Sequence, residues 1–263
     1  MVLSFDGESA SVRLPIVEAI CHADGRLRAG VVATVADICA GAVSGRLASP
    51  DWVATSDIAL HLVAGMTTGE LYLQSSLIRR GRSLIVIRLE GTVGEERCVA
   101  AEAAFAVLPY RGEAQSSQRR RSRSEESQSS GGFELGSPSL EEAIVDKLGV
   151  RVLEPSAGVV EMDLTDYVRN TFSALQGGLP AVLAEVAMES RGAHEAQRAV
   201  HTTDLRVRYL SQGRVGPFRT STEVLRAGAE SILLRVTVLD TGAEDRLVAV
   251  ATGTVALTRP GAS

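Results

Sequence analysis

Two acidic residues stand inside the two most apolar stretches of the chain, where an ordinary core would place leucine or valine. Asp37 and Glu185 are flanked almost entirely by alanine, valine, leucine, isoleucine and methionine. A buried carboxylate without a partner costs on the order of several kcal/mol. Each acid is therefore a candidate general base for water or a candidate nucleophile. The alternative is a structural carboxylate, held by local hydrogen bonds or by an arginine from the other half of the chain.

A glycine precedes each acid at the same spacing. Gly30 and Gly178 lie seven residues before the two acids, and Ala29 and Gly177 come directly before these glycines. A helix N-terminus presents free backbone N–H groups and a partial positive charge, and glycine there permits close approach of a ligand carbonyl. Such a site can stabilise an oxyanion, which together with a carboxylate indicates acyl transfer to water. Close packing of a helix on a sheet is the simpler reading of the glycines.

Both motifs belong to an internal repeat with an offset of 147 to 149 residues. Equivalent positions include Val12 and Val160, Gly30 and Gly178, Asp37 and Glu185, Asp57 and Asp204, and Val99 and Val248. Hydrophobic periodicity predicts the same order in each half, a strand, one apolar helix and four further strands. The predicted ranges are 12–20, 31–43, 55–63, 70–79, 83–93 and 97–108, then 159–168, 178–190, 202–210, 218–226, 231–240 and 246–258.

A fused duplication explains this pattern best, because a whole order of elements does not recur in register by chance. One sheet face cannot cover a helix that is apolar on most of its sides. The two halves are therefore expected to pair within the chain as an intramolecular pseudo-dimer. Each helix start would then face the other half.

Residues 111–136 interrupt the pattern with serine, arginine, glutamine and glutamate. Such a segment buries too little apolar surface to offset its chain entropy, so it is predicted to be a flexible linker. The arginines of 119–123 could otherwise form a nucleic-acid or membrane patch, but Glu125 and Glu126 offset part of their charge. The predicted domains are 1–110 and 137–263.

Composition narrows the class of protein. The chain is 45% hydrophobic and 22% charged, as a globular protein is, and its net charge of -5 gives no reason to expect nucleic acid as a partner. We find no apolar run of about 18 residues and no N-terminal signal peptide, so no membrane span is expected. Three cysteines without CxxC spacing fit a reducing, cytoplasmic compartment, and neither a cysteine zinc site nor another metal cluster is expected.

The region before Glu185 resembles the PaaI-type acyl-CoA thioesterases of the hotdog fold. Residues 170–178 read Asn-Thr-Phe-Ser-Ala-Leu-Gln-Gly-Gly, similar to the Asn-…-His-Gly-Gly-…-Asp/Glu motif of that family. The resemblance covers residues 12–108 and 159–258. It implies an α+β protein of two fused hotdog domains, each a curved antiparallel sheet wrapped around one long central helix. It also implies hydrolysis of an acyl-CoA to free acid and CoA, with no metal or redox cofactor.

By position, the resemblance implies that Gly177 offers its backbone N–H to the thioester carbonyl. Asn170 and Gln176 would shape the pocket, with Gln176 in place of the usual histidine. In this family the carboxylate comes from the opposite subunit, so Asp37 would serve this loop. This site is expected to be the better catalyst.

The second site departs further from the family motif. His22 holds the position of the asparagine, Arg28 that of the histidine and Ala29 that of the first glycine. With Gly30 and Glu185, these residues would form a site that is degenerate or only binds ligand. His22 could equally be a turn or interface residue.

Four further residues are expected to contact substrate. Thr202 and Thr203 lie in a strand that also fits the family pattern. Arg79 and Arg80 stand at a predicted hairpin, where they could bind the phosphates of CoA. A solvated turn fits these arginines as well.

Two other functions fit the same fold. One is a non-catalytic acyl-CoA-binding or scaffold protein, because a fold does not fix a function. The other is a hydratase or dehydratase, which usually pairs an aspartate with a histidine. It has the least support, because neither predicted helix carries a histidine near its acid. No Gly-Xaa-Ser-Xaa-Gly elbow occurs, which disfavours an α/β-hydrolase. The acyl group stays open, and exposed sheet edges would allow a homodimer.

Overall fold

The computed structural model describes residues 1–109, 133–134 and 141–258. Most of the predicted linker, 111–136, lies outside these residues. Within them the chain forms two long helices, α1 (Ala29–Ala48) and α4 (Leu179–Ala196), and the short α3 (Ile144–Lys147). The strands are β1 (Val2–Asp6), β2 (Ser9–Pro15), β3 (Trp52–Leu62), β4 (Glu70–Arg80), β5 (Leu84–Val93), β6 (Glu96–Leu108), β7 (Phe133–Glu134), β8 (Arg151–Glu154), β9 (Val159–Met162), β10 (Val200–Tyr209), β11 (Phe218–Ala227), β12 (Ser231–Asp240) and β13 (Arg246–Leu257).

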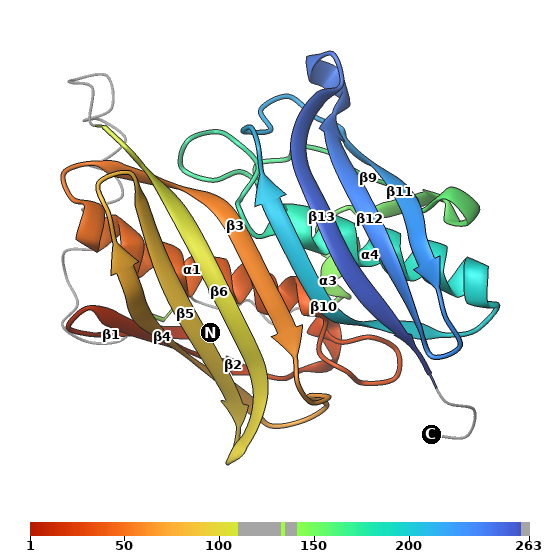
Figure 1. Ribbon diagram of the computed structural model, residues 1–263, viewed down its shortest axis with the longest axis horizontal. Coiled ribbons are helices and arrows are strands. Elements are labelled where there is room, and N and C mark those ends of the chain that lie inside the picture. The colour runs from red at the N-terminus through yellow and green to blue at the C-terminus, as the bar shows by residue number, and fades with distance from the viewer. Residues whose placement is uncertain (110–132, 135–140, 259–263) are drawn as a thin grey trace.

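All described strands join one antiparallel sheet, in the order β7-β1-β2-β4-β5-β6-β3-β10-β13-β12-β11-β9-β8. The strands of the first half occupy one side of this order and those of the second half occupy the other. Read outward from the β3–β10 junction, both halves place their strands in the same sequence. Figure 1 shows α1 behind the first group and α4 behind the second. The duplicated order inferred from the sequence is thus present in the sheet.

The junction between the halves is the antiparallel pairing of β3 with β10. Asp57 lies opposite Arg208, and Asp204 lies opposite His61. His61 and Arg208 are 147 positions apart, as Asp57 and Asp204 are, so the register is symmetric under exchange of the halves. The Arg206 guanidinium donates from Nε to both carboxylate oxygens of Asp57, each at 3.1 Å. This ion pair crosses the junction on an exposed face.

The N-terminal ends of the two helices approach each other through glycine. A Cβ added to Gly30 would lie 2.7 Å from Cα of Val182, and one added to Gly178 would lie 2.4 Å from Cα of Thr34. Real side chains do not reach such distances, so glycine is required at both crossings. The contacts are reciprocal, since Thr34 and Val182 are also 148 positions apart. Close packing therefore explains Gly30 and Gly178.

Helix α1 is apolar around most of its circumference. It is long and apolar enough, by length and composition, to cross a membrane, with a mean hydropathy of 1.5 over its most apolar 18-residue window. Of that window, 61% is buried inside the protein, because the sheet covers one side and α4 covers part of another. The predicted helix, 31–43, covers only part of this length.

Several boundaries differ from the predicted ones. The chain begins with a hairpin of β1 and β2, of which only part was predicted, and β2 ends at Pro15 instead of residue 20. Proline lacks the N–H that a ladder needs, and residues 18–20 form a 3-10 turn. The strand predicted over 159–168 ends at Met162. Residues 133–134, within the predicted linker, form β7 beside β1.

Candidate active site

Asp37 lies on α1 with its carboxylate held by both halves of the chain. The hydroxyl of Thr55, on β3, donates to Oδ1 at 2.7 Å. The side-chain amide of Gln176, in the loop before α4, donates to Oδ2 at 3.3 Å. The residue is only 7% exposed. Helical geometry explains the position, because Asp37 lies two turns beyond the start of α1 on the side that faces α4.

The orientation of the Gln176 amide is set by its second hydrogen bond. Its Oε1 accepts the backbone N–H of Gly178 at 2.8 Å. The amide nitrogen therefore faces Asp37, and a donor meets each carboxylate oxygen. Glutamine thus occupies the histidine position of the family motif as a fixed hydrogen-bond donor.

Asn170 orders the loop that carries Gln176. Its Oδ1 accepts the N–H groups of Phe172 and Ala174 at 2.9 and 3.1 Å, and its Nδ2 donates to the carbonyl of Leu175 at 3.4 Å. Phe172 packs edge-on against Trp52 of the first half, with ring centroids 4.7 Å apart. Asn170 is thus a positioning residue for the loop, and its side chain has no described contact with Asp37.

Gly177 lies directly against the carboxylate. A Cβ added there would lie 2.6 Å from Oδ2 of Asp37 and 3.0 Å from Oγ1 of Thr55. Its N–H donates to no group within the described part of the chain. The geometry therefore leaves one backbone donor at the start of α4, next to a buried carboxylate. These are the two groups that an acyl-transfer site needs.

Burial raises the pKa of Asp37 to about 6. The hydrogen bonds from Thr55 and Gln176 stabilise the charged form and oppose this rise. A carboxyl with this pKa is mostly ionised at neutral pH and still basic enough to accept a proton from water.

The equivalent position in the other half is closed. Oε1 of Glu185 accepts the backbone N–H of Ala29 at 2.6 Å, so the acid caps the donor that a carbonyl would need. Glu185 is fully buried, and its Oε2 has no hydrogen-bond partner. The two acids of the repeat therefore occupy different environments.

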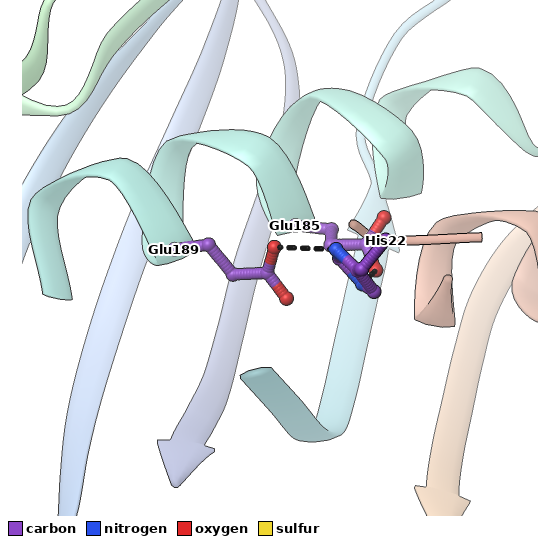
Figure 2. Close-up of side chains that lie close together, drawn as sticks. All are labelled: His22, Glu185 and Glu189. Atoms are coloured by element: carbon purple, nitrogen blue, oxygen red, sulfur yellow. Dashed lines mark ion pairs between the residues drawn. The ribbon is translucent and has the colours of Figure 1, made fainter. Parts of the chain in front are cut away.

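His22 reaches Glu185 from the loop that precedes α1. Its Nε2 lies 3.4 Å from Oε1 of Glu185, and its Nδ1 lies 3.5 Å from Oε2 of Glu189. Figure 2 shows both glutamates projecting from α4 toward the imidazole. His22 and Glu185 were predicted to share one site, whereas the contact of His22 with Glu189 was not predicted. The sequence analysis also missed that His22, Glu185 and Glu189 form a group that could hold a metal ion.

Opposing effects act on the titration of this group. Burial lowers the pKa of His22, but the hydrogen bond to Glu185 and the charge of Glu189 outweigh it, so the pKa is raised. Burial, followed by the charge of Glu185, raises the pKa of Glu189. His22 and the hydrogen bonds from Thr202 oppose that rise.

The other predicted substrate contacts lie apart from Asp37. Thr202 donates its N–H and its hydroxyl to Oε1 of Glu189, both at 2.9 Å, and the Thr203 hydroxyl donates to the carbonyl of Thr254. Arg28 is the N-cap residue of α1, with a buried Nε that lacks a partner. Arg79 and Arg80 are exposed at the end of β4.

Sequence reasoning missed two residues beside Asp37. Thr55 is one of several threonines in strands, and nothing in its local sequence marks it. The hydroxyl of Tyr209, on β10, is buried without a hydrogen-bond partner. Burial, followed by the charges of Asp37 and Asp57, raises the pKa of Tyr209 well above its ordinary value of 10. Thr55 lies on β3 and Tyr209 lies on β10, the two strands that pair at the junction of the halves. Their place on these strands was the only signal that could have indicated a role at the site.

Residues 25–100 match the family model of the thioesterase superfamily. No curated protein matches the chain. Solved structures with the same fold include the TesB protein of Mycobacterium avium subsp. paratuberculosis, with 12% identity, a TM-score of 0.66, and 98% of this chain and 96% of that chain covered. The 12:0-ACP thioesterase of Umbellularia californica has 10% identity and a TM-score of 0.63, with 96% and 95% covered.

A hotdog-fold protein of Alicyclobacillus acidocaldarius is similar at 13% identity and a TM-score of 0.63, with 98% of this chain and 96% of that chain covered. At these identities the likeness shows the fold. The predicted fold of two hotdog domains and the predicted resemblance to hotdog thioesterases are therefore confirmed.

Proposed function

Because this double-hotdog chain carries a thioesterase-superfamily match over residues 25–100, we propose that it hydrolyses acyl-CoA thioesters to free acid and CoA. The observation that carries the proposal is the position of Asp37 against Gly177 at the start of α4. The acid comes from one half of the chain and the free backbone donor from the other. The proposed reaction uses no metal or redox cofactor.

In the proposed mechanism, Asp37 acts as general base on a water molecule. It removes a proton while the water oxygen attacks the thioester carbon. The N–H of Gly177 stabilises the oxyanion, assisted by the partial positive charge of the helix start. When the carbon–sulfur bond breaks, the CoA thiolate takes the proton from Asp37.

The hydrogen bonds of Asp37 favour a base over a nucleophile. Thr55 and Gln176 each donate to one carboxylate oxygen, so both oxygens are oriented and partly neutralised. Hydrolysis in ¹⁸O-labelled water under single-turnover conditions distinguishes the two roles. With Asp37 as base, the water oxygen enters the product acid in the first turnover. With Asp37 as nucleophile, a mixed anhydride forms, and water attack on its aspartyl carbonyl places the label in Asp37 and leaves the first product acid unlabelled.

The two arginines of β4 support CoA as the carrier. Thr55 pairs with Phe105, Phe105 with Ile85 and Ile85 with Arg80 across adjacent strands. Arg80 is thus three strands away from Thr55, which is about 14 Å at roughly 4.8 Å per strand. The pantetheine arm of CoA separates the thioester from the phosphates by a length of this order. Arg79 and Arg80 could then pair with phosphate.

A non-catalytic acyl-CoA-binding function is the second candidate, because one of the two sites lacks the donor that hydrolysis needs. There the acid occupies the Ala29 N–H, so a bound carbonyl has no free donor at that position. We propose that the Asp37 site hydrolyses substrate and the Glu185 site does not.

A thiol-release assay tests the proposal with short, medium, long and aromatic acyl-CoAs, and with acyl-ACP as the alternative carrier. Wild type should release thiol from at least one acyl-CoA, and Asp37→Asn should lower the rate by about 10²- to 10⁴-fold. Glu185→Gln is the matched control and should keep most of the activity. Binding of acyl-CoA without thiol release, followed through Trp52 fluorescence, would favour the binding protein.

A further inference from the structure

Three side chains with metal-binding chemistry meet at the start of α1, apart from Asp37. His22 offers a ring nitrogen, and Glu185 and Glu189 each offer a carboxylate oxygen, with all of these atoms within 4.8 Å of one another. Glu185 and Glu189 are one turn apart on α4, so they project from the same side of that helix (Figure 2). His22 comes from the other half of the chain.

Each glutamate is oriented by hydrogen bonds to its Oε1. Oε1 of Glu189 accepts the N–H and the hydroxyl of Thr202, and Oε1 of Glu185 accepts the N–H of Ala29. Oε2 of Glu189 faces His22, and Glu185 faces His22 through Oε1 at 3.4 Å, while Oε2 of Glu185 is buried without any partner. Hydrogen bonds of this kind orient the ligands of a metal before it binds.

The charges in this cluster do not balance. Two carboxylates with side-chain exposures of 0% and 14% share a single histidine, which is 16% exposed. Arg28 acts on His22 through its charge, but it forms no ion pair within the described ranges 1–109, 133–134 and 141–258. A buried carboxylate oxygen without a partner is costly, and a cation would remove that cost.

We propose that His22, Glu185 and Glu189 bind one divalent transition-metal cation, Mn²⁺ or Zn²⁺. One imidazole nitrogen and two carboxylate oxygens suit these ions, and water would complete the coordination. Backbone hydrogen bonds also fix the loop around His22. The N–H of His22 donates to the carbonyl of Arg26, and the carbonyl of His22 accepts the N–H of Gly25. The metal would join the two halves at the position where the second acyl site is closed.

This site goes beyond the proposed hydrolysis and does not depend on it. The chemistry assigned to Asp37 uses none of the three ligands. Metal bound to Glu185 would keep that acid from acting as a base. The proposal therefore gives the closed half of the repeat a separate role.

Mn²⁺ binding to the chelator-treated full chain tests the site without any acyl-CoA. Free Mn²⁺ is followed by its electron paramagnetic resonance signal during titration, and Zn²⁺ is then added as competitor. Wild type should bind one Mn²⁺ per chain and release it to Zn²⁺. Glu189→Gln keeps the acceptor for Thr202 and removes the charge, so Mn²⁺ should bind at least tenfold more weakly.

Two controls keep this test decisive. Asp37→Asn alters the other acid of the repeat and should bind Mn²⁺ as wild type does. Thermal unfolding without metal shows whether Glu189→Gln remains folded, and His22→Gln gives a second variant with the same expected loss. Equal Mn²⁺ affinity in wild type and Glu189→Gln, or no saturable binding by wild type, would overturn the proposal. The cluster would then be an internal ion pair.

Discussion

At the scale of single residues, Asp37 combines two opposing requirements. Burial makes the carboxylate basic, while the donors Thr55 and Gln176 keep it ionised and oriented. Neither effect alone would suit a general base at neutral pH. Too little burial leaves an ordinary weak base, and loss of the donors leaves an acid that stays protonated.

The pH dependence of hydrolysis follows from this balance. Asp37 must be ionised to accept a proton, so kcat/KM should rise with pH through about 6 and then level off. Thr55→Val keeps the shape of the side chain and removes the donor, so the midpoint should move to higher pH. Thiol release between pH 4.5 and 9 measures this. Thr203→Val, in the corresponding strand of the other half, should leave the midpoint unchanged.

The buried charge of Asp37 should also limit stability. Its pKa is about 6 in the folded protein, above its ordinary 3.8, so the folded state holds the proton more tightly than the unfolded state does. The contribution of Asp37 to the free energy of unfolding is therefore full below about pH 4 and is lost as the pH rises through about 6.

Asp37→Asn removes this charge and should raise the free energy of unfolding at pH 8 by about 1–3 kcal/mol. At pH 4 the difference should nearly disappear. Urea unfolding at both pH values measures the effect. Equal stability of wild type and variant at pH 8 would contradict it.

At the scale of elements, the start of each helix decides what its neighbour can do. Helix α1 begins with Ala29 and Gly30, and Gly177 and Gly178 directly precede α4. Gly30 and Gly178 pack against the opposite helix. At α4 the Gly177 N–H is left free, whereas at α1 the Ala29 N–H is taken by Glu185. A longer acid reaches the donor that a shorter one leaves open.

Substitutions of the two neighbouring glycines should separate catalysis from packing. In Gly177→Ala the new Cβ would meet the carboxylate of Asp37 at 2.6 Å, so thiol release should fall at least tenfold. In Gly178→Ala it would meet the backbone of Thr34 at 2.4 Å, which should cost about 1–3 kcal/mol of stability.

Thiol release and thermal unfolding distinguish these two effects. Gly45→Ala, on α1, is the control, since its Cβ would lie 4.0 Å from the nearest atom, on Val53, and alanine favours the helix. Gly45→Ala should lower neither the rate of thiol release nor the temperature of thermal unfolding. A Gly178→Ala protein as stable as Gly45→Ala would refute the packing argument.

At the scale of the whole molecule, each half supplies what the other lacks. The β3–β10 pairing and the contacts between α1 and α4 bring Asp37 of the first half to Gly177 of the second. Neither half contains both groups in place. Both helices also have apolar surface that the partner half covers.

Separate fragments should therefore complement each other. Fragments 1–136 and 137–263, produced together, should co-purify and release thiol, whereas each alone should be inactive. Asp37→Asn in the first fragment should abolish the restored activity, and Glu185→Gln in the second should not. Activity of fragment 137–263 alone would show that the acid need not come from the other half.

Local pattern by itself determined the four strands that follow each long helix, the two apolar helices, the duplication and the two acids. These features depend on side-chain periodicity and on an offset that stays between 147 and 149 residues, both of which can be read along the chain. Asp37 and Gly177 could be paired because the repeat and the family resemblance together indicated which half each comes from.

Only the tertiary structure decided how the two sites differ. The partners of the acids are far apart in the chain: Gln176 lies 139 positions after Asp37, and Glu185 lies 156 positions after Ala29. Which N–H a carboxylate caps depends on the crossing of two helices and on the length of one side chain. Thr55, Glu189 and the orientation of His22 became significant only when folding brought the halves together.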